Sequence, residues 1–457
     1  MTVFRQPLLL PLMLLVSACT TTGTHQSKEN TRNDLLKAVE TTGAPKVKVF
    51  QFSKLPKLGT ARFPKVFEFH EGGWSGSSRV EQQPGQFAEN EFWTINDRGL
   101  NLYLEEKDSN NGLTFKSGDR YFPLPHFNQT IFKISLNADG SGKVLEQLPV
   151  IAEAAPTNGL PSSYRELATG ESGYALNATT GSFEALPLSP RGFDFEGVAQ
   201  TFNRSGEREF WLVEEYGPSV LRADGAGNIT QRWSPSRDHA MKKVSLPWVF
   251  RQRADNRGFE GVTVSGDSVL AALQSPIDAK GGPSGLEGHG NNATRIHRIL
   301  RINRTHGLVE QFAYEHSKGA QRFGDKPKNV KIGDLAAIDD SGNRFLVLEH
   351  ASQRKHIALF EATIKPETTR LADTNAYESG EKQFTPVETR LAADLSETLK
   401  GIDLPEKAEG ISIINNKTIV LIFDNDHCIE PLLGLLPQSK MCENLAVLIG
   451  FPQPLFQ

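Results

Sequence analysis

The sequence has only three cysteines among its 457 residues, and it contains no Cys-x-x-Cys pair and no His-x-x-x-His spacing. These absences argue against the common zinc sites. Its 50 basic residues are balanced by 54 acidic ones, so the excess positive charge of a nucleic-acid-binding protein is missing. A Gly-x-Ser-x-Gly nucleophile elbow is also absent, which leaves nucleophilic serine catalysis without a sequence signature.

The one marked apolar run, residues 7–16, is too short to cross a bilayer as a stable helix. An arginine precedes it and the residues Ser17, Ala18 and Cys19 follow it, which resembles the lipobox of bacterial lipoproteins. We therefore predict a signal peptide over residues 1–18 and lipidation of Cys19, with an ordinary secretory signal as the alternative. The polar residues 19–45 predict a flexible tether.

This N-terminus predicts an exported protein, in the periplasm or at the cell surface, that contacts the membrane only through its lipid anchor. Thr20 follows the anchoring cysteine in place of the aspartate associated with inner-membrane retention. The outer membrane is therefore the preferred location.

The two remaining cysteines, Cys428 and Cys442, predict a disulfide, since isolated pairs in exported proteins are usually bonded. In the chain-entropy model, closing this loop of about 15 residues contributes about 3 kcal/mol.

An acidic residue beside a glycine, placed just before an apolar alternating segment, recurs along the chain. It occurs in "RGFDFEGVAQ", "NRGFEGVTV", "KIGDLAAIDD" and "KAEGISII", at intervals of 64, 74 and 75 residues. A divergent first copy is "EGGWSGSSRV". Such a period indicates a repeat architecture.

Each copy is followed by a β-branched and aromatic segment that ends on polar residues, such as "FWLVEEYG", "FLVLEHAS" and "TIVLIFDND". Paired strands at this period predict an all-β fold over residues 46–457, a β-propeller of six blades. The segment "KVKVFQF" near the N-terminus is expected to supply the last strand and close the ring, which removes exposed edges. Two unrelated β-domains are the alternative.

The ordered series "GGWSGSS", "FWTINDRG", "FEGVA", "NRGFEGVTV", "LAALQSP", "LVLEH" and "AEGISI" through "DND" resembles the phytase-like proteins described by the esterase-like activity of phytase. The resemblance extends from about Phe63 to Asp426. It implies a propeller-like β fold and the hydrolysis of ester or phosphoester bonds.

If the repeated motifs begin equivalent strands around a channel, their carboxylates converge and repel one another unless they bind cations. A set of oxygen ligands suits Ca²⁺. The predicted metal ligands are Glu196, Glu260, Asp334, Glu409 and Asp424. The predicted catalytic residues are Glu260, Glu196, Asp97, Arg98 and Arg257, and the predicted substrate-binding residues are Arg191, Lys407 and Glu215.

In this interpretation one carboxylate orients a water, and Arg98 or Arg257 binds the anion of a small ester or phosphoester substrate. The alternative is that each cation only neutralises a neighbouring acid. The sequence therefore predicts a monomeric, metal-assisted hydrolase, and leaves open a lactonase-like propeller and a non-catalytic binding or assembly lipoprotein.

Overall fold

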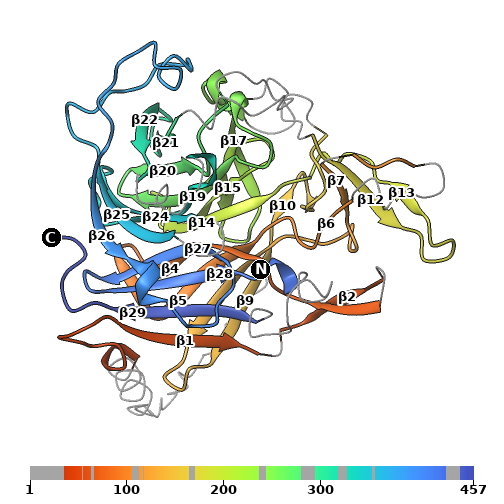
Figure 1. Ribbon diagram of the computed structural model, residues 1–457, viewed down its shortest axis with the longest axis horizontal. Helices are drawn as coiled ribbons and strands as arrows, with labels where there is room; N and C mark the ends of the chain where they lie inside the picture. The colour runs from red at the N-terminus through yellow and green to blue at the C-terminus, as the bar shows by residue number, and fades with distance from the viewer. Residues whose placement is uncertain are drawn as a thin grey trace, which may run out of the picture.

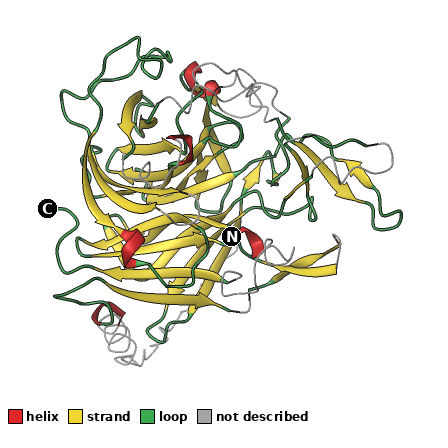
Figure 2. Cartoon of the chain, in the orientation of Figure 1, coloured by secondary structure: helices red, strands yellow, loops and turns green. Residues whose placement is uncertain are grey.

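The computed structural model describes residues 35–53, 55–62, 66–104, 113–116, 118–163, 170–235, 243–278, 294–317, 327–351, 356–428 and 443–457. Strands dominate this part of the chain (Figure 2), and the predicted all-β class is confirmed. The short helices are α2 (Leu395–Thr398), η3 (Trp248–Gln252), η5 (Pro327–Asn329) and η7 (Asp426–Cys428). The predicted signal peptide, Cys19, Cys442 and the side chain of Cys428 lie outside the described residues, and no helix within them is long and apolar enough to span a membrane.

Five sheets follow one another along the chain (Figure 1). The first contains β4 (Trp74–Gln83), β5 (Gln86–Asn96), β8 (Thr130–Leu136) and β9 (Gly142–Pro149). The second contains β14 (Phe195–Phe202), β15 (Arg208–Glu214), β16 (Ser219–Asp224), β17 (Ile229–Ser234) and β18 (Lys243–Ser245). The third contains β19 (Phe259–Ser265), β20 (Ser268–Leu273), β21 (Ile296–Asn303) and β22 (Val309–Glu315).

The fourth sheet contains β23 (Lys331–Ala337), β24 (Arg344–Ala351), β25 (His356–Thr363) and β26 (Glu388–Asp394). The fifth has the order β1 (Lys46–Phe52), β29 (Asn444–Gly450), β28 (Thr418–Asp424) and β27 (Lys407–Asn415). We call β4, β14, β19, β23 and β27 the inner strands, because each contacts the next in this order and β27 contacts β4 again.

The remaining strands belong to smaller sheets. β6 (Leu102–Tyr103), β7 (Asp119–Tyr121), β12 (Ser172–Leu176) and β13 (Phe183–Ala185) form one of them, and its outer hairpin projects from the body (Figure 1). β2 (Lys57–Arg62) pairs with β3 (Val66–His70), and β10 (Ile151–Ala152) pairs with β11 (Ala155–Pro156). The hairpin of β8 and β9 pairs within the first sheet. The prediction of six units is therefore not confirmed.

The N-terminal segment packs onto the last sheet. β1 pairs antiparallel with β29 along its whole length, from Lys46 opposite Gly450 to Phe52 opposite Asn444. Leu35 and Val39, which lie in the predicted tether, are buried in the same apolar cluster as Phe52. The part of the tether after residue 34 is therefore packed against the sheet.

Four inner strands carry a β-bulge at the repeated motif. The register shifts between Phe195 and Gly197, Phe259 and Gly261, Ile332 and Asp334, and Ala408 and Gly410. The extra residues are therefore Glu196, Glu260, Gly333 and Glu409. A bulge changes the direction of the side chains beside it. Because the bulge residue of the third copy is Gly333, Asp334 corresponds in register to the glycines of the other copies and not to their glutamates.

The motif glycines allow neighbouring inner strands to approach each other. A Cβ atom on Gly261 would lie 2.6 Å from Asp334 Cα, and one on Gly410 would lie 2.8 Å from the Gly76 carbonyl carbon. Backbone packing this close has no room for a side chain. These glycines are therefore required for the close approach of the inner strands.

We expect Gly261→Ala to lower the free energy of unfolding by about 1–3 kcal/mol, because the added methyl group forces two packed backbones apart. Urea unfolding followed by tryptophan fluorescence measures the loss. The matched control is Gly43→Ala, where an added Cβ meets nothing within 4 Å. Equal stabilities of the two variants would contradict the packing role.

Candidate functional site

Carboxylates and cations gather where the inner strands begin. The second strand of each sheet runs antiparallel to the inner strand, so it ends beside that beginning. Lys331 on β23 is opposite His350 on β24, and Lys407 on β27 is opposite Asp424 on β28. The motif residues and the polar ends of the second strands therefore meet at this end of the inner strands.

Two groups of side chains have the geometry of potential metal ligands. Within each group, the candidate ligand atoms all lie within 4.8 Å of one another, and every residue is buried. The carboxylate group comprises Asp194, Glu196 and Glu215, and the mixed group comprises Glu260, His350 and Glu409.

Several ligand atoms in these groups lack a hydrogen-bond partner among the described residues. They are Asp194 Oδ2, Glu215 Oε1, Glu260 Oε1 and His350 Nε2. Asp194 Oδ2 has a weaker ion contact, 3.5 Å from Arg98 Nη1. Buried polar atoms are almost always hydrogen-bonded. These unpaired atoms therefore indicate that the cluster binds a ligand.

The carboxylates of the two groups repel one another. Burial, followed by the charges of Glu260 and Asp194, raises the pKa of Glu196 well above its usual value. Burial and the nearby charges of Glu215 and Glu409 do the same for the pKa of Glu260. Burial raises the pKa of Glu409 to about 8, although Lys407 opposes this shift. A bound cation would relieve this repulsion.

Basic side chains lie around the same groups. Burial and the charges of Arg257 and Lys407 lower the pKa of Lys331. Burial, with Lys331 next in importance, lowers the pKa of His350 well below its usual value. A neutral imidazole is the form of histidine that binds metals.

The comparisons with known proteins bear on this cluster. Residues 71–427 match the family model named phytase-like, which is described as esterase-like activity of phytase. The chain belongs to this phytase-like family. The matched range includes every member of the two ligand groups, and the family resemblance of the sequence motifs is confirmed.

Curated proteins include no match to the chain. Among solved structures, PhoX from Pseudomonas fluorescens, in complex with the transition-state analogue vanadate, is 11% identical, with 90% of this chain and 97% of that chain covered and a TM-score of 0.36. A Synechocystis apocarotenoid oxygenase is 9% identical, with 86% and 78% covered and a TM-score of 0.30. The PQQ-bound aldose sugar dehydrogenase from Streptomyces coelicolor is 9% identical, with 90% and 100% covered and a TM-score of 0.29.

In this phytase-like chain, the structure brings the predicted residues Glu196, Glu215, Glu260 and Glu409 into the ligand groups. Asp334 is not part of either group, and both of its carboxylate oxygens accept hydrogen bonds from backbone N–H groups.

Two further predicted residues pair with each other. Lys407 Nζ lies 2.8 Å from Asp424 Oδ2 and 2.6 Å from Asp426 Oδ1. Burial and the charge of Asp426 raise the pKa of Asp424 to about 6. Lys407 thus neutralises acids at the end of β28, as the alternative interpretation of these cations expects.

Arg98 is buried in a network of its own. Its Nη1 donates to Glu171 Oε2 at 2.7 Å and to Asn256 Oδ1 at 2.9 Å. Its backbone N–H donates to Asp194 Oδ1 at 3.1 Å. Through its contact with Asp194, Arg98 helps to hold the carboxylate group in position.

Asp97 and Arg191 lie outside both ligand groups. Asp97 Oδ1 accepts a hydrogen bond from the Gly99 N–H at 2.7 Å and lies 3.5 Å from His427 Nε2. The Arg191 N–H donates to Ser189 Oγ, and its carbonyl accepts from the Asn158 N–H, which places it in the turn before β14.

Sequence reasoning missed Asp194, Lys331 and His350. Asp194 and Lys331 stand two positions before the bulge residues Glu196 and Gly333, the spacing at which Lys407 precedes Glu409. That shared spacing is the signal that identifies them.

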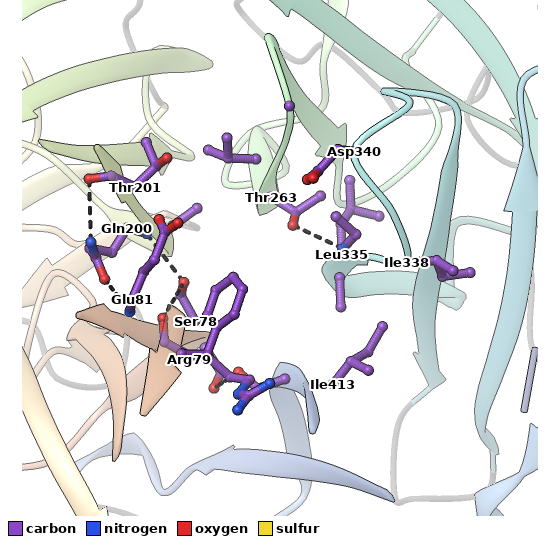
Figure 3. A pocket seen from close by; sticks show the side chains of 18 of the residues that line it. Ser78, Arg79, Glu81, Gln200, Thr201, Thr263, Leu335, Ile338, Asp340 and Ile413 are labelled. Carbon is purple, nitrogen blue, oxygen red and sulfur yellow. Dashed lines mark hydrogen bonds between the residues drawn. The ribbon is translucent and has the colours of Figure 1, made fainter. Parts of the chain in front are cut away.

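A hollow of about 680 Å³ lies where the inner strands end, on the side away from the two ligand groups. Figure 3 shows its polar side chains, including Arg79, Glu81 and Gln200, facing the aliphatic Ile338 and Ile413. None of the residues of the two ligand groups lines it.

A buried histidine pair in the third sheet predicts acid sensitivity. His297 Nδ1 lies 3.2 Å from the Leu273 carbonyl oxygen, and His297 Nε2 lies 3.0 Å from His316 Nδ1. Burial lowers the pKa of His297 to about 4 and that of His316 to about 2. Both rings are therefore neutral in the folded protein at neutral pH.

We expect stability to be full above the unfolded-state histidine pKa of about 6.5 and to fall as the pH drops below it, by up to about 1.4 kcal/mol per pH unit for each histidine. The reason is that only the unfolded chain takes up these protons. Urea unfolding between about pH 7.5 and pH 5 measures the slope. The double variant His297→Gln/His316→Gln should flatten this slope, and an unchanged slope would contradict the assignment.

Proposed function

We propose that this chain is a metal-assisted hydrolase of phosphoester bonds. Membership of the phytase-like family supports hydrolysis of this class. The observation that carries the proposal is the pair of buried ligand groups with unpaired carboxylate and imidazole atoms.

The donor atoms of the two groups fit divalent cations. Asp194, Glu196 and Glu215 offer only oxygen ligands, which suits Ca²⁺. Glu260, His350 and Glu409 add one imidazole, a donor that transition metals such as zinc and iron also accept. A bound cation would polarise the phosphoryl oxygens and lower the pKa of a water.

The protein contributes charge and orientation around these groups. Arg257 donates to Gln274 Oε1, and Gln274 Nε2 donates to Glu260 Oε2 at 2.8 Å. Arg257 is half-buried and lines a pocket beside the cluster. It is therefore the arginine that we assign to the substrate phosphate.

We also propose that the five sheets are the blades of a propeller closed by β1. The N-terminal sequence supports an exported protein held by lipid on Cys19, with the outer membrane preferred, and we propose that it is a monomer. Cys428 and Cys442 stay a proposed disulfide.

One observation favours a second candidate, a non-catalytic binding module. Lys331 and Lys407 lie among the acids and neutralise part of their charge without any metal. In this alternative the cluster only holds the inner strands together.

Removing divalent cations separates the two candidates. We expect dialysis against a chelator to abolish hydrolysis of para-nitrophenyl phosphate, and added Ca²⁺ to restore it, because the carboxylate groups need a cation to bind the phosphate. Release of para-nitrophenol measures the rate. Full activity after rigorous chelation, or no activity against a broad set of phosphoesters before it, would contradict the proposal.

A further inference from the structure

The hollow where the inner strands end is separated from the two ligand groups by packed backbone. A Cβ atom on Gly76 would lie 2.7 Å from Gly197 Cα, and one on Gly197 would lie 2.6 Å from the Glu260 carbonyl oxygen. The four residues that donate their backbone N–H groups to the Asp334 carboxylate all line the hollow, so this carboxylate lies beneath its floor. A molecule bound in the hollow therefore does not reach the ligand groups.

The polar side chains of the floor are hydrogen-bonded to their neighbours. Ser77 Oγ lies 2.8 Å from Ser412 Oγ. The Gln200 side chain accepts from the Glu81 N–H at 2.6 Å and donates to the Thr201 carbonyl oxygen at 3.3 Å. Because these groups already have partners, the floor does little to select a polar ligand.

Apolar side chains form much of the wall. Val264, Ile338 and Ile413 line the hollow and are only half-buried, as is Phe202. Phe87, at the start of β5, lines it as well and is 47% exposed. Covering this surface removes apolar area from water, so the wall favours a ligand with an apolar body.

The two arginines that line the hollow are held by the protein itself. Arg79 Nη1 donates to the Ile414 carbonyl oxygen at 3.3 Å and its Nη2 to that of Ala88 at 2.9 Å. Arg304 Nη2 donates to Glu209 Oε1 at 3.0 Å, and the same guanidinium donates to two backbone carbonyl groups. Both cations are therefore already paired with acceptors of the wall.

The two acids that line the hollow lack a comparable partner. Glu81 is half-buried and Asp340 is exposed, so a ligand can reach both side chains, and Figure 3 shows them on two sides of the hollow. Within the described residues neither carboxylate forms an ion pair, and Glu81 Oε1 accepts from the Gly85 N–H at 2.6 Å. Burial raises the pKa of Glu81, and the charge of Asp340 adds to this shift although the Gly85 N–H and the charge of Arg304 oppose it. A positive charge between the two acids would relieve their repulsion.

We propose that this hollow binds an organic cation with an apolar body, such as an alkylammonium ion. The apolar body covers Val264, Ile338 and Ile413, and the ammonium group lies between Glu81 and Asp340. A bare metal ion would leave the apolar wall in water, and an organic anion would be repelled by the two acids. This site is additional to the proposed hydrolysis and does not depend on it.

The test compares octylammonium with octanoate, which have chains of the same length and opposite charge, by isothermal titration calorimetry of the purified protein. We expect the Kd of octylammonium to be at least about tenfold lower, because one end group is attracted by the acids and the other is repelled. Lengthening the chain from butylammonium to octylammonium should lower the Kd by up to about fourfold for each methylene group.

Glu81→Gln/Asp340→Asn removes both charges and keeps the sizes of the side chains. It should raise the Kd of octylammonium at least about tenfold and leave the hydrolysis of para-nitrophenyl phosphate unchanged. Asp403→Asn, at an exposed position that does not line the hollow, is the matched control and should bind as the wild type does.

Three results would each overturn the assignment: equal Kd values for octylammonium and octanoate, equal Kd values for butylammonium and octylammonium, or an unchanged Kd in the double variant. The first two use the wild-type protein, so they decide the matter even if the variant fails to fold. Each of them leaves the hydrolase proposal standing, and a protein without hydrolase activity that binds octylammonium as expected leaves this inference standing.

Discussion

Glu260→Gln is expected to reduce phosphoester hydrolysis at least a hundredfold while raising the stability of the metal-free protein. The side chain is fully buried beside Glu215 and Glu409, and burial and these charges raise its pKa. Glutamine keeps the size and still accepts from Gln274, but it removes one repelling charge and one metal ligand. Losses of this size follow when a charged group acts on the reacting phosphate.

Rates with para-nitrophenyl phosphate and thermal unfolding of chelated protein give the two readouts. The matched control is Glu378→Gln, a buried acid that accepts from Arg298 Nε at 2.8 Å, far from the inner strands in sequence. It should lower the unfolding temperature and keep turnover. Lower stability of Glu260→Gln in chelated protein, with binding of partners intact, would favour the non-catalytic module.

Asp334→Ala is expected to destabilise the fold by more than about 4 kcal/mol, because it leaves buried N–H donors unpaired at a cost of about 1–3 kcal/mol each. Asp334 is 1% exposed. Its Oδ2 accepts from the backbone N–H groups of Ser77 and Ile411 at 3.1 and 2.9 Å. Its Oδ1 accepts from those of Leu335 and Val262 at 2.8 and 3.3 Å.

These four donors belong to four of the five inner strands, so one carboxylate links β4, β19, β23 and β27. Urea unfolding measures the effect, and loss of folded protein on expression is its extreme form. Asp340→Ala, at an exposed position after β23, is the control. A stability within about 0.5 kcal/mol of that control would contradict the linking role.

Local sequence patterns predict the inner strands, but they do not predict the positions of the bulges in them. "FEGV", "KIGDL" and "AEGI" begin inner strands as expected, because their apolar residues alternate around a glycine that close packing requires. In "KIGDL" the glycine precedes the acid. Alignment by acid therefore placed Asp334 among the metal ligands, while the bulge residue is Gly333.

The sequence also predicts only in part which residues at the strand ends join the ligand groups. Asp424 ends β28 and Glu215 directly follows the last residue of β15, but on β24 His350, one position beyond Glu349, joins the ligand group. Glu349 instead accepts from Tyr314 and Ser317 at 2.7 and 2.9 Å. Successive side chains of a strand point to opposite faces, so a shift of one residue decides which of them enters the cluster.

The predicted number of blades was inferred from the spacing between the repeated motifs, and insertions change that spacing. The long interval before the second motif contains β6, β7, β12 and β13, which form a sheet outside the five. β8 and β9 pair within the first sheet, and the predicted number of six blades is not confirmed.

The most direct test of the central claim is the metal content of the purified protein, measured by mass spectrometry of the elements, beside that of Glu260→Gln/His350→Gln. We expect the wild-type protein to retain divalent cation through gel filtration, and the double variant, in which only the mixed group is broken, to retain less cation and to lose hydrolysis while it stays folded. Equal metal content in the two proteins, or full hydrolysis by a metal-free wild type, would contradict it.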